Sequence, residues 1–125
     1  MGVGLLYHLA HEGWTDTLLI EKGELTSGST WHAAGLVPHF IGSLNMAKVH
    51  AYGIDLYKAL EAETGMSTGW HGCGAIRLAV TEDQADWYRY VQGVLGSLDV
   101  ESHLISPDEV RQRVPLMGST DDIIL

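Results

Sequence analysis

Two residues near the start of the chain have the types and the spacing of a dinucleotide-binding unit. Gly2 precedes an apolar stretch, and Glu21 follows nineteen positions later. A helix N-terminus offers free N–H groups and the positive end of its dipole to a pyrophosphate. An acid about twenty residues further on accepts hydrogen bonds from a ribose. Gly2 would then be the last glycine of G-x-G-x-x-G. A turn glycine and a solvated carboxylate explain the same spacing, so both interpretations stand at this point.

No other set of reactive side chains is complete. His8 and His11 are three positions apart, but no acid or cysteine completes a zinc site with them. His71 and Cys73 lie in a glycine-rich stretch without a second pair of ligands, so we interpret them as loop residues. The sequence contains neither a Ser-His-Asp order nor a phosphate-binding loop. We therefore predict no metal site and assign no catalytic acid or base within these residues.

The elements that would position this unit alternate between helix and strand. Residues 3–11 have apolar side chains at helical spacing, and Gly13 is a typical helix stop. Residues 17–20, TLLI, are a short apolar run of the kind that forms strands buried on both faces of a parallel sheet. A loop is predicted over 22–29 and a short helix over 30–35. This order of helix, strand and glycine-containing loop is the one that a dinucleotide site requires.

The rest of the chain continues the mixed pattern. Apolar periodicity, helix caps and glycine stops predict helices over 44–64, over 82–95 and from Ser106, with Pro107 in its first turn, to Pro115. Branched apolar runs predict strands over 74–80, over 103–105 and in the closing DDIIL. We therefore expect an α/β fold. A helix with no strand before it, and a strand that is still running at Leu125, lead us to expect a piece of a larger protein.

Composition narrows the class of protein. The chain has 125 residues, enough for one modest domain, of which 46% are hydrophobic and 18% charged. Its formal charge of −9 argues against a protein that binds nucleic acid or an anionic membrane surface. One cysteine excludes an internal disulfide framework, and no apolar run is long enough for a membrane span. The fifteen glycines are scattered singly, which indicates tight turns rather than a linker.

The segment EKGELTSGSTWHAAGL, residues 21–36, resembles the flavin-binding segment of the sarcosine and dimethylglycine dehydrogenases. These enzymes belong to the amino-acid-oxidase-like group of FAD proteins. The resemblance continues over residues 5–22, 60–79 and 100–117, so it covers nearly the whole chain. Its most specific part is STWHAAG, which is far more informative than a partial glycine fingerprint.

The resemblance implies a role for each matching residue. Gly2 would lie near the FAD pyrophosphate, and Glu21 would bind the adenosine ribose with Lys22 beside it. His32 matches the histidine that is bonded to the 8α carbon of the flavin in these enzymes, and Trp31 would be a wall of the pocket. The pyrophosphate and isoalloxazine would be lined by Gly28, Ser29, Thr30, Trp31, His32, Ala33, Ala34, Gly35 and Leu36.

The fold and the reaction also follow from the resemblance. Residues 1–125 would be an incomplete Rossmann-like FAD-binding domain of the amino-acid-oxidase type that lacks its first strand, and alone they would bind FAD poorly. The family removes a hydride from the N-methyl carbon of sarcosine or dimethylglycine and passes the electrons to an electron-transfer flavoprotein or to oxygen. The groups that hold the substrate carboxylate lie beyond these residues. The location would be cytoplasmic in a bacterium and the mitochondrial matrix in a eukaryote.

Two other functions remain open at this stage. The regulatory subunit of pyruvate dehydrogenase phosphatase is a non-catalytic relative of the same family. The Trp31-His32 pair favours the enzyme, because that branch does not keep it. The third possibility is a plain α/β segment whose glycines only make turns, and the length of the resemblance argues against it.

Overall fold

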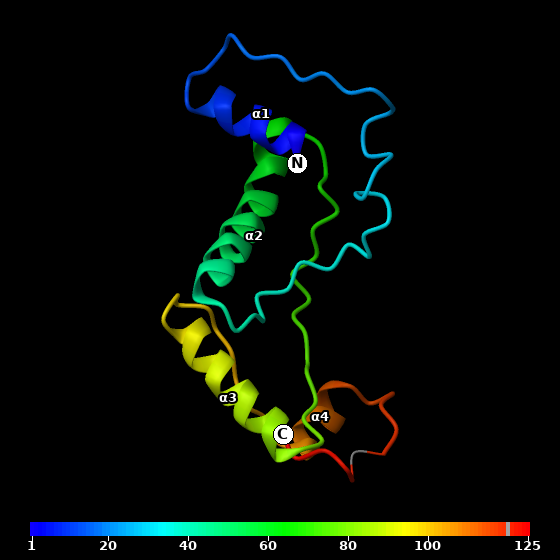
Figure 1. The fold of residues 1–125 in the computed structure, drawn as a ribbon. Helices are drawn as coiled ribbons and strands as arrows, with labels where there is room; N and C mark the ends of the chain where they lie inside the picture. Colours follow the sequence, from blue (N-terminus) through cyan, green and yellow to red (C-terminus); the bar gives the residue numbers. More distant parts are fainter. Residues whose placement is uncertain (120) are drawn as a thin grey trace. The chain divides into compact units, whose positions relative to one another are not determined.

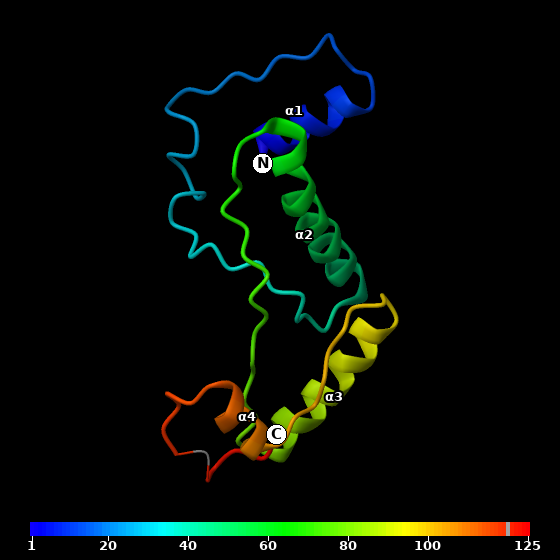
Figure 2. The same ribbon diagram turned by 180° about the vertical axis from the view of Figure 1, so that it is seen from behind.

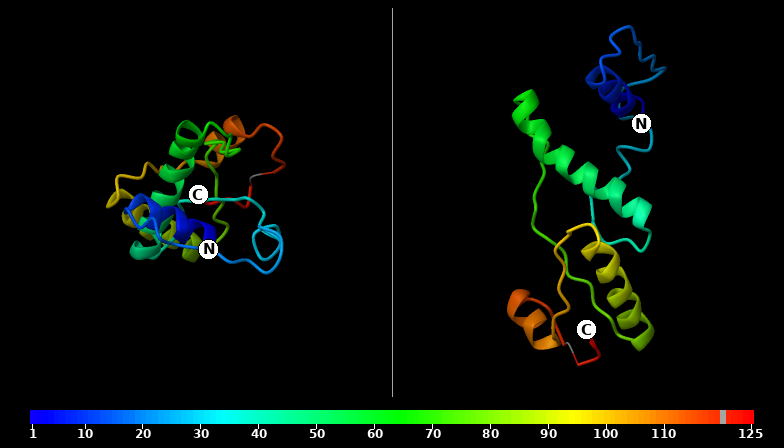
Figure 3. Two further views of the ribbon diagram at one scale, coloured as in Figure 1. Left: turned by 90° about the horizontal axis from the view of Figure 1, so that it is seen from above. Right: turned by 90° about the vertical axis from the view of Figure 1, so that its left-hand side faces the viewer.

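The computed structural model describes residues 1–119 and 121–125, and it contains four helices (Figure 1). They are α1 (Gly2–His11), α2 (Leu44–Thr64), α3 (Glu82–Gly96) and α4 (Pro107–Arg113). The chain forms two compact units, which we call the N-terminal unit, Met1–Leu36, and the C-terminal unit, Val37–Leu125. Figures 2 and 3 show the helices of each unit from other sides. In the part of the chain described, no helix is long and apolar enough to cross a membrane.

The N-terminal unit has one helix followed by a long irregular segment. Helix α1 ends where the sequence predicts, because Gly13 has a φ of 87° and its N–H donates to the carbonyl of Ala10 at 3.0 Å. The N–H of Trp14 donates to the carbonyl of Leu9 at 2.9 Å and completes the cap. No residue of α1 is buried. The helix is thus held by its own backbone bonds and its cap rather than by a core.

The expected α/β fold, including the Rossmann-like arrangement, is wrong for this structure, because the residues that it describes contain no strand. The run 17–20 is irregular, and Leu18 and Ile20 are each 82% exposed. A strand buried on both faces needs a neighbour on at least one edge to pair its N–H and C=O groups. No such neighbour lies beside residues 17–20 in this unit, so their apolar pattern does not produce a strand.

The other predicted strands are also absent from the described residues, although two backbone hydrogen bonds join the segment 74–80 to the end of the chain. Residues 74–80 and 103–105 have no ladder. However, the N–H of Ala79 donates to the carbonyl of Leu125 at 2.9 Å, and the N–H of Ile124 donates to the carbonyl of Ala79 at 2.8 Å. Two hydrogen bonds at one residue are too few for a strand. They do bring together the two segments that the sequence predicts as β-structure.

The helices of the C-terminal unit begin and end close to the predicted residues. Helix α2 has the predicted bounds and stops at Gly65, which has a φ of 70° and donates its N–H to the carbonyl of Glu61. Helix α3 is capped by Thr81, whose side chain accepts from the N–H of Gln84. Helix α4 is capped in the same way by Ser106, and Pro107 stands in its first turn. These ends are local in origin, which explains why the sequence predicts them.

Seven apolar residues form a small core in the C-terminal unit, where α2 contacts α3. They come from all three helices and from the extended segment before α3: Ala47, Ile54, Ala79, Ala85, Val91, Leu95 and Val110. Burial of this apolar surface is the main stabilising contribution that the unit offers. No residue of the N-terminal unit is buried.

Aromatic side chains from α3 and from the segment before α2 contact one another in the C-terminal unit. Trp87 and Tyr90 of α3 stack with ring centroids 5.2 Å apart, and the Tyr90 hydroxyl donates to the carbonyl of Gly42 at 3.2 Å. Phe40 meets Tyr88 edge-on at 5.2 Å. The segment before α2 is therefore held against α3 by ring contacts and a hydrogen bond.

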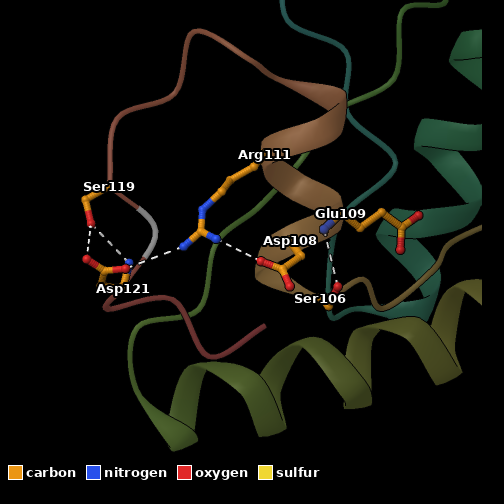
Figure 4. Close-up of polar contacts among 6 residues, drawn as sticks. All are labelled: Ser106, Asp108, Glu109, Arg111, Ser119 and Asp121. Carbon is orange, nitrogen blue, oxygen red and sulfur yellow. Dashed lines mark hydrogen bonds and ion pairs between the residues drawn. The ribbon is translucent and has the colours of Figure 1, made fainter.

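A polar network connects α4 to the turn that follows it (Figure 4). Arg111 contacts Asp108 of its own helix at 2.8 Å and Asp121 of the turn at 3.4 Å. The Ser119 hydroxyl donates to the other oxygen of Asp121 at 2.7 Å. All of these side chains are exposed, so screening by water keeps each ion pair weak. The network holds Asp121 close to α4, but it contributes little to the stability of the fold.

Candidate functional site

The segment that resembles a flavin site forms a run of turns between residues 24 and 33. The backbone N–H of Ser27 donates to the carbonyl of Glu24 at 3.2 Å, and that of Ala33 donates to the carbonyl of Thr30 at 3.2 Å. The predicted helix over 30–35 is therefore wrong. A helix of six residues has too few hydrogen bonds to offset its nucleation cost, and Gly35, with a φ of 75°, ends any helical path.

One unusual backbone conformation marks the same segment. Thr26 has a φ of 69°, in the left-handed region that a β-branched residue rarely adopts. A threonine at this position does not indicate a positive φ, so this conformation could not be predicted from the sequence. Such strain is found where a loop must be held in one path.

His32 lies exposed on this turn with one ring nitrogen bound to the backbone. Its Nδ1 is 3.1 Å from the carbonyl oxygen of Gly28. A carbonyl oxygen only accepts, so the ring hydrogen is on Nδ1 and the lone pair is on Nε2. The residue that the resemblance singles out as a nucleophile thus presents its nucleophilic nitrogen away from the backbone.

Trp31 lies against His32 instead of packing into a core. The two ring centroids are 4.3 Å apart with an interplanar angle of 43°, and the indole is 67% exposed. Trp31 was expected to be a wall of a pocket. The structure places it against one side of the imidazole that it would enclose.

The remaining residues of the turn are open to solvent. Ser29, Thr30, Ala33, Ala34 and Leu36 are exposed, and Leu36 is 84% so. A Cβ built on Gly28 or Gly35 meets nothing within 4 Å. Two exposed hydroxyls and an imidazole lone pair are groups that fit a flavin dinucleotide.

Gly2 and Glu21 make their contacts with residues outside positions 28–36. A Cβ on Gly2 would lie 2.8 Å from Leu19 Cδ1, so the glycine allows α1 to approach the 17–20 segment closely. Glu21 Oε1 accepts from the N–H of Gly23 at 3.1 Å, and Lys22 beside it is exposed. Among the described residues, no hydrogen bond joins either Gly2 or Glu21 to residues 28–36. The structure brings Gly28, Trp31 and His32 together, whereas the site expected to unite Gly2 and Glu21 with this turn stays a prediction.

The other histidines have structural neighbours. His8 and His11 both lie near the ring of Tyr7, with centroid separations of 5.1 and 6.2 Å. Cys73 is exposed in a loop, where its N–H donates to the carbonyl of His71 at 2.9 Å. Within residues 1–119 and 121–125, no group of three or more His, Cys, Asp and Glu side chains is arranged to hold a metal ion.

Comparison with protein families assigns the class of protein. The family described as FAD dependent oxidoreductase (DAO) matches residues 1–124. The chain therefore belongs to this family of FAD-dependent oxidoreductases, as the resemblance of residues 21–36 predicts. No solved structure matches the chain.

Individual relatives narrow the comparison within the family. The chain is 45% identical over 118 residues to the mitochondrial dimethylglycine dehydrogenase of Homo sapiens, which covers 94% of this chain and 14% of that enzyme. It is 36% identical over 122 residues to the mitochondrial sarcosine dehydrogenase of Homo sapiens, covering 97% and 13%. The mitochondrial pyruvate dehydrogenase phosphatase regulatory subunit of Mus musculus is 36% identical over 121 residues, covering 97% and 14%. The chain thus spans about one seventh of the length of these relatives.

Proposed function

We propose that residues 1–125 are part of the FAD-binding domain of an oxidoreductase that demethylates an N-methylated glycine. The observation that carries this proposal is His32, whose Nε2 lone pair faces away from the backbone on an exposed turn. Membership of an FAD-dependent family and 45% identity to a dimethylglycine dehydrogenase support it. Either dimethylglycine or sarcosine is the proposed substrate.

Each part of the turn has a proposed task toward the flavin. The backbone of residues 28–32 and the hydroxyls of Ser29 and Thr30 would hold the pyrophosphate and the flavin ring. Gly35 and Leu36 would complete the lining with Ala33 and Ala34. Gly2 lets α1 approach Leu19, and Glu21 with Lys22 would serve the ribose. His32 would tether the flavin through Nε2.

The bound flavin would supply the hydride acceptor, and the protein would supply placement. In the proposed reaction a hydride leaves the N-methyl carbon of the substrate, and the electrons then pass to an electron-transfer flavoprotein or to oxygen. Residues 1–125 would fix the flavin so that the substrate methyl group meets it in one orientation. No catalytic acid or base is assigned to this segment. The proposed location is the mitochondrial matrix for a eukaryotic chain and the cytoplasm for a bacterial one.

The alternative is a non-catalytic regulatory protein, which the 36% identity to the phosphatase regulatory subunit supports. Flavin attachment separates the two. A regulatory relative has no need of a covalent flavin, whereas the Trp31-His32 contact gives this chain a side chain oriented for one.

The test is flavin retention by the complete protein whose reading frame contains these residues. After denaturation in acid, we expect yellow fluorescence to remain with the polypeptide on a denaturing gel. The variant His32→Ala should release it, whereas His71→Ala, which changes another exposed loop histidine, should retain it. Flavin that is bound but released by acid contradicts the tether, and a protein without flavin favours the regulatory alternative.

A further inference from the structure

Two different groups restrain the imidazole of His32 in this structure. The Gly28 carbonyl accepts from Nδ1 at 3.1 Å, and the Trp31 indole lies against the ring at a centroid distance of 4.3 Å. The hydrogen bond acts on the Nδ1 edge of the imidazole, and the indole lies beside the ring at an interplanar angle of 43°. Both neighbours come from the same turn of the N-terminal unit, so the arrangement is complete within five consecutive residues.

Both restraints matter for a histidine that must attack through one nitrogen. A histidine side chain turns about its outer torsion between two broad orientations, which exchange the place of Nδ1 with that of Cδ2 and the place of Nε2 with that of Cε1. It also exists as two neutral tautomers, of which only the nitrogen without hydrogen is nucleophilic. The Gly28 carbonyl selects hydrogen on Nδ1. The indole narrows the rotation that would carry Nδ1 away from that carbonyl.

We propose that Trp31 is a positioning residue that holds His32 with Nδ1 on the Gly28 carbonyl and Nε2 ready for bond formation. This inference rests on the proposed function, in which Nε2 becomes bonded to the flavin. In that step the Nε2–C8α bond forms and one C–H bond of the flavin methyl group breaks. Two electrons and two protons, one from the methyl group and one from the imidazole, go to dioxygen and give hydrogen peroxide. In this role Trp31 forms no bond to the reacting atoms and acts through its contact with His32.

The rate of covalent attachment tests this role directly. The complete protein is produced without flavin, mixed with saturating FAD in air, and sampled over time for fluorescence that survives denaturation. We expect Trp31→Leu to attach flavin about fivefold more slowly, because freeing one side-chain torsion costs a few-fold in the population of the reactive orientation. Trp31→Phe retains a ring face and should stay within about twofold of the parent rate.

Two controls separate positioning from folding and from binding. Trp14→Leu removes a tryptophan of similar exposure, 65% against 67%, elsewhere in the N-terminal unit and should leave the rate unchanged. The dissociation constant for non-covalent FAD is measured in the parent and in Trp31→Leu, and the attachment rates are compared with both proteins saturated with FAD. The proposal is overturned if Trp31→Leu attaches flavin at the parent rate, or if Trp31→Phe is as slow as Trp31→Leu.

A second readout does not need flavin at all. With nitrogen-15 in the histidine rings of the flavin-free protein, the signals of His32 are those that disappear in His32→Ala. We expect hydrogen on Nδ1 in the parent and a shift toward hydrogen on Nε2 in Trp31→Leu. If the tautomer shifts but no covalent flavin forms in the parent, the proposed function fails and the positioning role stands. If the tautomer of His32 is the same in Trp31→Leu as in the parent, the positioning role is contradicted, whether or not the flavin is covalent.

Discussion

Trp87 lies directly over Gly42, and this glycine has no room for a side chain. A Cβ built there overlaps the six-membered ring of Trp87, whose neighbour Tyr90 is bonded to the carbonyl of the same glycine. The ring cannot swing aside without losing its stack on Tyr90, at 5.2 Å. The requirement for glycine at position 42 is therefore one of space, since its backbone does not have a positive φ.

We expect Gly42→Ala to lower the free energy of unfolding by about 1–2 kcal/mol, the usual cost of forcing an extra methyl group into an occupied space. Urea unfolding followed by tryptophan fluorescence measures it. Gly53→Ala is the matched control, because Gly53 lies within α2 and a Cβ there meets nothing within 4 Å. That control should gain up to about 1 kcal/mol from helix propensity. Equal stability of the two variants would contradict the packing argument.

The helices of the C-terminal unit start at three caps that differ in one respect. Thr81 and Ser106 each accept a backbone N–H with the side-chain oxygen, whereas Ser43 at the start of α2 makes no such bond. In addition, the side chain of Gln84 accepts from the N–H of Val80 at 2.9 Å, which ties the first turn of α3 to the chain before it. Helix α3 thus has the most complete cap of the three.

Removal of a cap should destabilise only where the bond exists. We predict that Thr81→Ala lowers the free energy of unfolding by about 1 kcal/mol. Ser43→Ala should change it by a few tenths at most, and Thr81→Ser should restore most of the loss. Circular dichroism during thermal unfolding of the three variants gives the comparison. A loss in Ser43→Ala as large as that in Thr81→Ala would show that side-chain capping is not the cause.

These same features explain which parts of the fold the sequence predicts. Helix ends depend on residues within a few positions, so Gly13, Gly65 and Ser106 predict them correctly. Strands depend on partners that are distant in sequence. The run 17–20 has the composition of a buried strand, but composition does not supply the neighbour that would pair with it.

The candidate site divides along the same line. The sequence identifies His32 and Trp31 through a local motif, and they lie in contact on one turn. It does not reveal the Gly28 carbonyl as the partner of Nδ1 or the left-handed conformation of Thr26, because both depend on the path of the turn. The joint role expected of Gly2, Glu21 and residues 28–36 stays a prediction.

At the scale of the whole molecule, apolar burial is unequally distributed. All seven buried apolar residues belong to the C-terminal unit, and the N-terminal unit contributes none. Many large apolar side chains of the N-terminal unit are exposed instead, among them Trp14, Leu18, Ile20, Trp31 and Leu36. The stability of the chain should therefore be that of residues 37–125.

Deletion of residues 1–36 tests this expectation. We predict that the free energy of unfolding of residues 37–125 stays within about 0.5 kcal/mol of the value for the whole chain, since no buried apolar side chain is removed. Residues 1–36 alone should show little helix in water, because α1 has only ten residues. A loss of more than about 1 kcal/mol on deletion would show that the N-terminal unit contributes to the core's stability.

The two hydrogen bonds of Ala79 also have a consequence for the order of folding. They join residues on either side of α3 and α4, so they close a long chain loop that contains both helices. Helices and caps form from neighbouring residues on a fast timescale, whereas closing a long loop must first overcome its entropy. The amide of Ala79, a residue with 0% exposure, would thus become protected from hydrogen exchange only after both helices are in place.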